Sequence, residues 1–138
     1  MKIGFLINYF YPRKGGAENN CFYLARELAK KHDVSVYTSD KKGKTRFKKY
    51  EVIDNIKINR FKSFRYKYYS AIYPKMLFKV LKDDLDILHV HSIGFLWHDL
   101  IVIFKKITSP KTRIINTPHG HFMALKNYPA WQKIIKFK

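Results

Sequence analysis

Two kinds of residue in this sequence have the types and spacing for chemistry: paired glycines near the start, and histidines later in the chain. Gly15 and Gly16 follow an apolar, strand-like segment at residues 2–11 that Pro12 ends, and they permit a backbone path that side chains would forbid. A glycine turn before a helix presents unpaired backbone N–H groups, which favour an anion such as a phosphate. The turn lacks the P-loop ending and the three-glycine dinucleotide spacing, so a tight turn without a ligand stays open.

Histidines close two later apolar segments. His89 and His91 alternate within residues 85–92, so a strand would place both on one face. A metal pair would need a third ligand at matching spacing, and none is nearby, so we expect no metal there. His119 stands between Pro118 and Gly120, which predicts a histidine at the tip of a strand at residues 113–121.

The spacing of apolar side chains predicts the elements that position these residues. Helical spacing begins at Ala17 and is expected to end near residues 30–32, and a strand follows at 33–38. A strand, helix and strand of this length imply a right-handed crossover and a parallel sheet. Ligands of such sheets bind outside the carboxyl ends of the strands, so we expect His119 and the glycine turn to face one cleft.

The middle of the chain is basic and partly aromatic. Residues 41–49 predict a surface loop, and Asp54-Asn55 predict the tight turn of a hairpin whose second arm, at 56–61, enters the sheet. Residues 61–73 interleave aromatic and basic side chains. Three interpretations of that segment stay open: an irregular loop packed on the domain, a membrane contact, or a nucleic-acid contact.

Three further helices are predicted. The first, at residues 74–82, has Met76 and Val80 on its inner face. The second, at 94–106, is nearly apolar all round and is expected to be well buried. The third is a short basic helix within residues 122–138.

Composition narrows the class of protein. The 138 residues fit one domain, and 46% hydrophobic residues predict a folded chain. The chain has one cysteine, Cys21, which excludes an internal disulfide. No apolar run is long enough to cross a bilayer. We therefore expect a cytoplasmic protein. The formal charge of +18 predicts an anionic partner: a nucleic acid, an anionic membrane surface or a phosphorylated ligand. No nucleic-acid-binding motif is present, so that partner is the least favoured.

Three stretches, in this order, resemble the N-terminal domain of retaining glycosyltransferases of the GT-B type, the large family-four group. They are Tyr11-Pro12 with Gly15-Gly16-Ala17-Glu18, then residues 86–92, then Thr117-Pro118-His119-Gly120. The resemblance covers essentially the whole chain. The turn at Asp54-Asn55 also looks like the family's pattern, where glycine is more usual.

The resemblance implies an α/β fold: a Rossmann-like parallel sheet flanked by helices, one half of a GT-B fold and incomplete at its C-terminus. In such enzymes the turn matching Gly15 and Gly16 approaches the donor diphosphate, with Glu18 capping or orienting it. The residue matching His119 assists sugar transfer by hydrogen bonding or charge. His91 and Gly120 are assigned to the acceptor side. The co-substrate is a nucleotide-diphosphate sugar, and no metal is expected.

The resemblance also predicts the biochemical role. Residues 1–138 would form the acceptor-side domain of a sugar-nucleotide-dependent enzyme acting on a lipid-linked or polysaccharide acceptor. We expect a peripheral position on the inner membrane face. Its partner would be a C-terminal donor-binding domain or subunit, without which the chain is expected to be inactive. The alternatives are a non-catalytic membrane-docking subunit of a split glycosyltransferase and, less favoured, a basic nucleic-acid-binding module.

Overall fold

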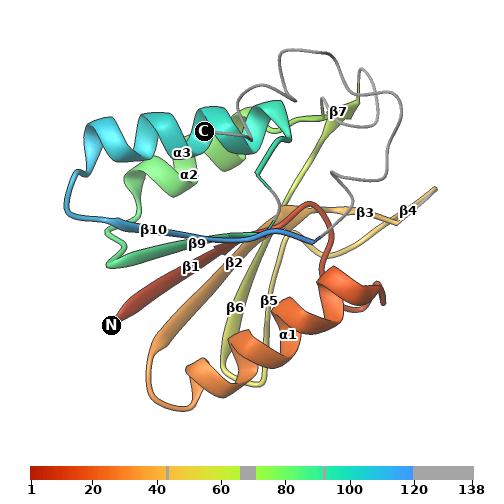
Figure 1. Ribbon diagram of the computed structural model, residues 1–138. Helices are drawn as coiled ribbons and strands as arrows, with labels where there is room; N and C mark the ends of the chain where they lie inside the picture. Colours follow the sequence, from red (N-terminus) through yellow and green to blue (C-terminus); the bar gives the residue numbers. More distant parts are fainter. Residues whose placement is uncertain (43, 66–70, 92, 120–138) are drawn as a thin grey trace.

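A six-stranded sheet with helices on both faces forms the centre of the fold, as seen in a computed structural model that describes residues 1–42, 44–65, 71–91 and 93–119 (Figure 1). The strand order is β10-β9-β1-β2-β6-β5; all neighbours are parallel except β5, which is antiparallel to β6. The bounds are Lys2–Leu6 (β1), Asp33–Ser39 (β2), Tyr50–Ile53 (β5), Ile56–Phe61 (β6), Ile87–His91 (β9) and Arg113–Thr117 (β10). The predicted α/β class is confirmed, and the fold is consistent with a Rossmann-like half of a GT-B fold.

Helices cover the sheet on both sides. Helix α1 (Gly16–Ala29) lies on one face, and α2 (Pro74–Lys82) and α3 (Leu96–Thr108) lie together on the other (Figure 1). The strand-helix-strand crossover from β1 through α1 to β2 pairs Ile3 with Val34 in parallel register, as predicted. The helix predicted at residues 74–82 is confirmed, with Met76 and Val80 buried.

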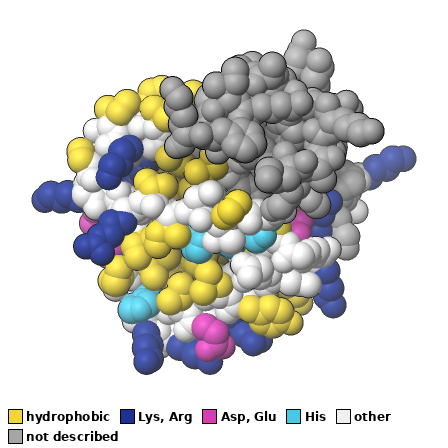
Figure 2. All heavy atoms as spheres, in the orientation of Figure 1, with side chains coloured by type: hydrophobic (Ala, Val, Ile, Leu, Met, Phe, Trp, Pro, Cys, Tyr) yellow, Lys and Arg dark blue, Asp and Glu magenta, His cyan; other side chains and the backbone are white. Residues whose placement is uncertain are grey.

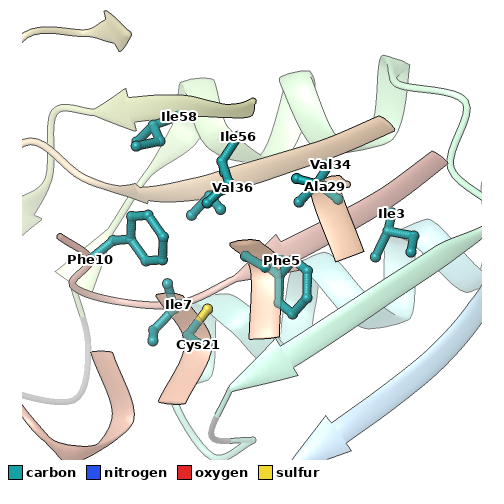
Figure 3. Close-up of a cluster of buried hydrophobic side chains, with 11 residues drawn as sticks. Ile3, Phe5, Ile7, Phe10, Cys21, Ala29, Val34, Val36, Ile56 and Ile58 are labelled. Atoms are coloured by element: carbon teal, nitrogen blue, oxygen red, sulfur yellow. The ribbon is translucent and has the colours of Figure 1, made fainter. Parts of the chain in front are cut away.

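The core on the α1 side follows from strand alternation. Ile3 and Phe5 of β1, and Ile7 just after it, point toward the helix, where Cys21 packs among them (Figure 3). Small residues on α1, such as Ala25, allow the helix to approach the sheet closely. Burial, followed by the charge of Glu18, raises the pKa of the Cys21 thiol, so this cysteine is a core residue and not a nucleophile.

The core on the α2–α3 side uses the other face of the same strands. Leu6, Leu88 and Val90 meet Met76 and Ile101 there, and all are buried.

Tyr37 and Gly4 set the packing at one end of this second core. The Tyr37 hydroxyl, buried with its ring, donates to Asp83 Oδ2 at 2.6 Å. A Cβ at Gly4 would lie 2.8 Å from Leu85 Cδ1 and 2.9 Å from the Tyr37 ring, so a larger residue here would force one of these two side chains to shift.

The predicted hairpin is confirmed. Asp54 and Asn55 adopt positive φ values of 49° and 63°, as a two-residue turn of the mirror-image type requires. Its second arm enters the sheet as β6, which pairs in parallel with β2.

Two sequence-based expectations about connecting segments are wrong. β1 ends at Leu6, well before Pro12, although the next two residues still lie beside β2: Ile7 N–H donates to Tyr37 O at 3.2 Å, and Ser39 N–H donates to Asn8 O at 3.1 Å. The segment at 41–49 is not simply a loop: β3 (Lys41–Lys42) and β4 (Thr45–Arg46) form a short antiparallel ladder. Arg46 Nη1 of β4 donates to the buried Asp40 carboxylate at 2.6 Å, which connects this ladder to the end of β2.

Helix α3 is less buried than its composition suggests. It runs from Leu96 to Thr108, and Ile103 and Ile107 on its outer side are 53% and 68% exposed. Only one side of the helix meets the sheet, and that side includes Lys105. The buried Lys105 Nζ donates to Asp83 O at 2.6 Å, where the carbonyls at the C-terminus of α2 attract a cation.

The aromatic segment at residues 61–73 was expected to be irregular if it packs on the domain, but both of its ends contain strands. β7 (Phe64–Arg65) pairs with β8 (Ala71–Ile72), and Tyr73 is buried. Residues 66–70 lie outside the described part of the chain, and so does the basic helix predicted within 122–138. Among the helices described, none has the length and apolar character to cross a membrane.

Candidate functional site

The strand order creates a switch point beside β1. The chain leaves β1 toward β2 on one side, and later returns to pair β9 on the other side. The connection after β1 leads to α1 on one face of the sheet, and the connection after β9 leads to α3 on the other face. The two connections therefore diverge at the carboxyl ends of β1 and β9, which is where ligands bind in open α/β sheets. The ends of β1, β9 and β10 lie at this edge, toward the right in Figure 1, and α1 also begins on that side.

Three histidines form a column at this edge, in which His89 and His91 stack and His119 meets His91 edge to edge. His89 and His91 lie on one face of β9, as their alternation predicted, with ring centroids 4.6 Å apart. His119, just beyond β10, continues the column at 5.0 Å from His91, and His91 Nδ1 lies 2.7 Å from His119 Nε2. Phe5 of β1 packs against His89 and His91 at 5.1 Å and 5.8 Å. Three neighbouring strands therefore supply one site.

Burial makes the inner histidines of this column neutral at physiological pH. His91 is 1% exposed, and burial, with the nearby His89 and His119, lowers its pKa to about 3. Burial and then the charge of His119 also lower the pKa of His89. His89 Nε2 lies 2.7 Å from Thr117 Oγ1 of β10, which fixes the orientation of its ring. His119 is only half-buried and so lies at the open end of the column.

The backbone conformation of the glycine turn differs from the one expected. Gly15 is the N-cap of α1 with φ −170° and ψ 171°, an extended conformation that any residue adopts. A Cβ on Gly16 would meet nothing within 4 Å. Neither glycine needs the backbone freedom that the sequence analysis expected, so that prediction is wrong; at Gly15 it is the Glu18 carboxylate that occupies the space of a Cβ. What the turn offers is access: Gly16 is exposed at the helix N-terminus, where backbone N–H groups lack intrahelical acceptors.

Glu18 lies against this turn. Its carboxylate oxygen occupies the space that a Cβ on Gly15 would need. Arg13 Nε is 3.8 Å from Glu18 Oε1, and the Arg13 guanidinium lies 3.8 Å over the Tyr9 ring. The acid therefore lies between the turn and a partly exposed cation.

Residues that the sequence analysis missed hold the loop after β1. Arg60 is 3% exposed; its Nη2 donates to Tyr11 O at 2.7 Å, and its Nη1 pairs with Glu51. The hydroxyl of Tyr73 donates to Asn8 Oδ1 at 3.1 Å. One signal for Arg60 was present: it follows Ile56 and Ile58 at alternate positions, so strand periodicity places its charge on the buried face.

The loop after β9 is held in place as well. Gly94 has φ 106°, a backbone conformation that favours glycine, and its N–H donates to Asp99 Oδ1 at 2.9 Å. Ile93 N–H donates to Asn116 Oδ1 of β10 at 3.3 Å. This loop is therefore tied to the strand that leads to His119.

A cavity of about 430 Å³ lies at the opposite, amino edge of the sheet, lined among others by Lys2, Asp33, Lys57 and Asp83. Its charges pair with one another: Lys57 Nζ lies 2.8 Å from Asp33 Oδ1, for example. The cavity lies at the opposite edge from the histidine column, and none of the three histidines lines it. Within the described ranges, no three His, Cys, Asp or Glu side chains gather in a way that could hold a metal ion.

The structure thus brings some of the predicted site residues together. His91 and His119 are in direct contact, and Gly15, Gly16 and Glu18 cluster at the start of α1. Gly120 lies outside the described residues. That the histidines and the glycine turn face one cleft stays a prediction.

Comparison with known proteins gives this site a family context. No curated protein matches the chain. The family model described as Glycosyltransferase Family 4 matches residues 14–137, which include the glycine turn and all three histidines of the column. The match covers most of the sequence, and the chain therefore belongs to Glycosyltransferase Family 4.

Proposed function

We propose that the chain is the acceptor-side domain of a GT-B enzyme that transfers sugar from a nucleotide-diphosphate sugar with retention of anomeric configuration. Family membership supports a glycosyltransferase role. The single observation that carries the proposal further is the contact between His91 and His119 at the carboxyl edge of the sheet, beside the switch point.

In this proposal each part of the edge has its own role. His119 lies beside the transferred sugar and the donor phosphate and stabilises charge that develops between them. The N–H groups at Gly15 and Gly16 contact the donor diphosphate, and Glu18 orients the turn. His91 and Gly120 lie toward the acceptor. No metal is needed for these contacts.

A C-terminal donor-binding domain or subunit completes the enzyme, so the isolated chain is proposed to be inactive. We further propose a lipid-linked or polysaccharide acceptor and a peripheral position at the inner membrane face. The net charge of +18 supports attraction to anionic lipid. Figure 2 shows lysine and arginine side chains around apolar ones, and Phe78 and Ile107 on the α2–α3 side are 69% and 68% exposed.

The test is sugar transfer by the intact two-domain enzyme, offered a panel of sugar nucleotides with a lipid extract. We expect His119→Ala to lower kcat by about 10²-fold or more, and to lower the free energy of unfolding by about 1 kcal/mol, the low end of the cost of an unpaired His91 Nδ1, because removing the half-buried His119 ring admits water to that nitrogen. His32→Ala, after α1 at the amino edge of the sheet, is the matched control and should retain activity. Absence of transfer with every donor, or equal losses of activity and stability in His119→Ala, would contradict the proposal.

A further inference from the structure

The contact between His91 and His119 also bears on how His119 acts: as a neutral hydrogen-bond donor or as a cation. His91 Nδ1 lies 2.7 Å from His119 Nε2, and the two rings are within 18° of parallel. One of these two nitrogens must donate and the other must accept. The position of the proton on His91 therefore decides which nitrogen of His119 is protonated.

His91 is built to stay neutral. Its ring is 1% exposed and is enclosed by Phe5 and His89, with ring centroids at 5.8 Å and 4.6 Å. Burial, with the neighbouring imidazoles, lowers its pKa to about 3. A neutral imidazole carries one N–H, so His91 has a single proton to place on Nδ1 or Nε2.

The surroundings of His91 favour Nδ1. Its Nε2 is buried and meets no hydrogen-bond partner among the described residues. A proton on Nε2 would be an orphaned buried N–H, whereas a bare Nε2 is an under-satisfied acceptor, which folded proteins tolerate more readily. With the proton on Nδ1, His91 donates to His119 Nε2.

We infer that His91 is a positioning residue that donates Nδ1–H to His119 Nε2 and thereby holds His119 as the neutral tautomer with its proton on Nδ1. Placing a proton on Nε2 of His119 would force His91 to move its own proton to the unpartnered, buried nitrogen. The catalytic meaning rests on the proposed function: His119 then acts on the donor sugar or phosphate as a neutral hydrogen-bond donor and not as a cation.

The rest of the column supports His91 in this role. His91 stacks on His89, and His89 Nε2 is fixed by Thr117 Oγ1 at 2.7 Å. Thr117 also pairs with His91 in the parallel register of β9 and β10. The ring that orients His119 is therefore held by both strands, and by Phe5 of β1.

The experiment is nitrogen NMR of the histidine rings in the ¹⁵N-labelled full chain at pH 7.5, where long-range ¹H–¹⁵N correlations separate protonated from bare ring nitrogens. We expect His119 to show a bare Nε2 and a protonated Nδ1. A protonated Nε2 on His119 would overturn the inference, whatever the variants show.

Three variants test whether His91 is the cause. His91→Phe keeps an aromatic ring but removes the donor, so His119 Nε2 loses this hydrogen bond and the His119 ring-nitrogen signals should change. His91→Asn restores an N–H donor near the position of Nδ1 and should return His119 to the Nδ1–H form. His98→Phe removes a buried imidazole on the opposite face of the sheet and should change nothing at His119.

Unchanged His119 signals in His91→Phe would also overturn the inference. If that variant does not fold, the wild-type tautomer still decides the question. The measurement needs no sugar transfer, so it separates the two proposals: loss of the predicted tautomer refutes this inference alone, while absence of transfer refutes the proposed function alone.

Discussion

Acidification should destabilise the protein through a histidine outside the candidate site. His98 of α3 is completely buried between Tyr73 and Phe95, with ring centroids 6.4 Å and 5.6 Å away. Neither of its ring nitrogens has a hydrogen-bond partner within the described part of the chain. Burial lowers the pKa of His98 from an ordinary 6.5 to about 4. The folded state therefore keeps His98 neutral at a pH where the unfolded chain is already protonated.

The sign and size of the effect follow from this difference. Between pH 6.5 and pH 4 the unfolded chain binds the extra proton, so the free energy of unfolding falls as the pH falls. Fully expressed, a pKa of about 4 against 6.5 costs about 3 kcal/mol. At pH 5.0 the loss from His98 is about 2 kcal/mol, and His91, with a pKa of about 3, should add a similar loss.

Urea unfolding of the wild type and His98→Phe at pH 7.5, 6.5, 5.5 and 5.0 measures this contribution. A change in packing caused by phenylalanine shifts the free energy of unfolding equally at every pH. The loss between pH 7.5 and pH 5.0 should therefore be about 2 kcal/mol smaller in the variant. Parallel curves for the two proteins would refute the reasoning, because His98 would then titrate equally in the folded and unfolded states.

Two further predictions concern glycine and its absence. Gly4→Val should lower the free energy of unfolding by about 1–3 kcal/mol, because a Cβ there approaches Leu85 and Tyr37 too closely. Urea unfolding measures this loss, and Gly16→Ala is the control because its Cβ meets no neighbour. Asn55→Gly should raise the free energy of unfolding by about 0.5 kcal/mol, since glycine adopts φ 63° without strain, and the thermal midpoint should rise by about 2 °C. Equal effects of Gly4→Val and Gly16→Ala, or a lowered midpoint for Asn55→Gly, would contradict these explanations.

Local patterns predicted much of the fold. The alternation of apolar residues indicated the parallel strands, and Asp54-Asn55 indicated the hairpin, because these residues tolerate the backbone that the turn needs. The spacing of His89 and His91 predicted that both share one face, which the stacked rings confirm. These features depend on neighbours in sequence, so the sequence alone could reveal them.

Features that depend on distant neighbours were not predictable in this way. The apolar composition of α3 does not reveal that one side of the helix stays exposed while Lys105 is buried against the end of α2. The hydrogen bond between His91 and His119 requires the register of β9 and β10. Likewise, the contact of Arg60 with Tyr11 joins segments that only the folded sheet brings together.

The central position of β1 has a consequence for how the chain acquires its structure. During synthesis β1, α1, β2 and the β5–β6 hairpin emerge first and contain partners for one side of β1. The partner for the other side, β9, emerges much later, so one edge of β1 stays unpaired until then. Because β9 also supplies His91, the histidine column belongs to this late, long-range step.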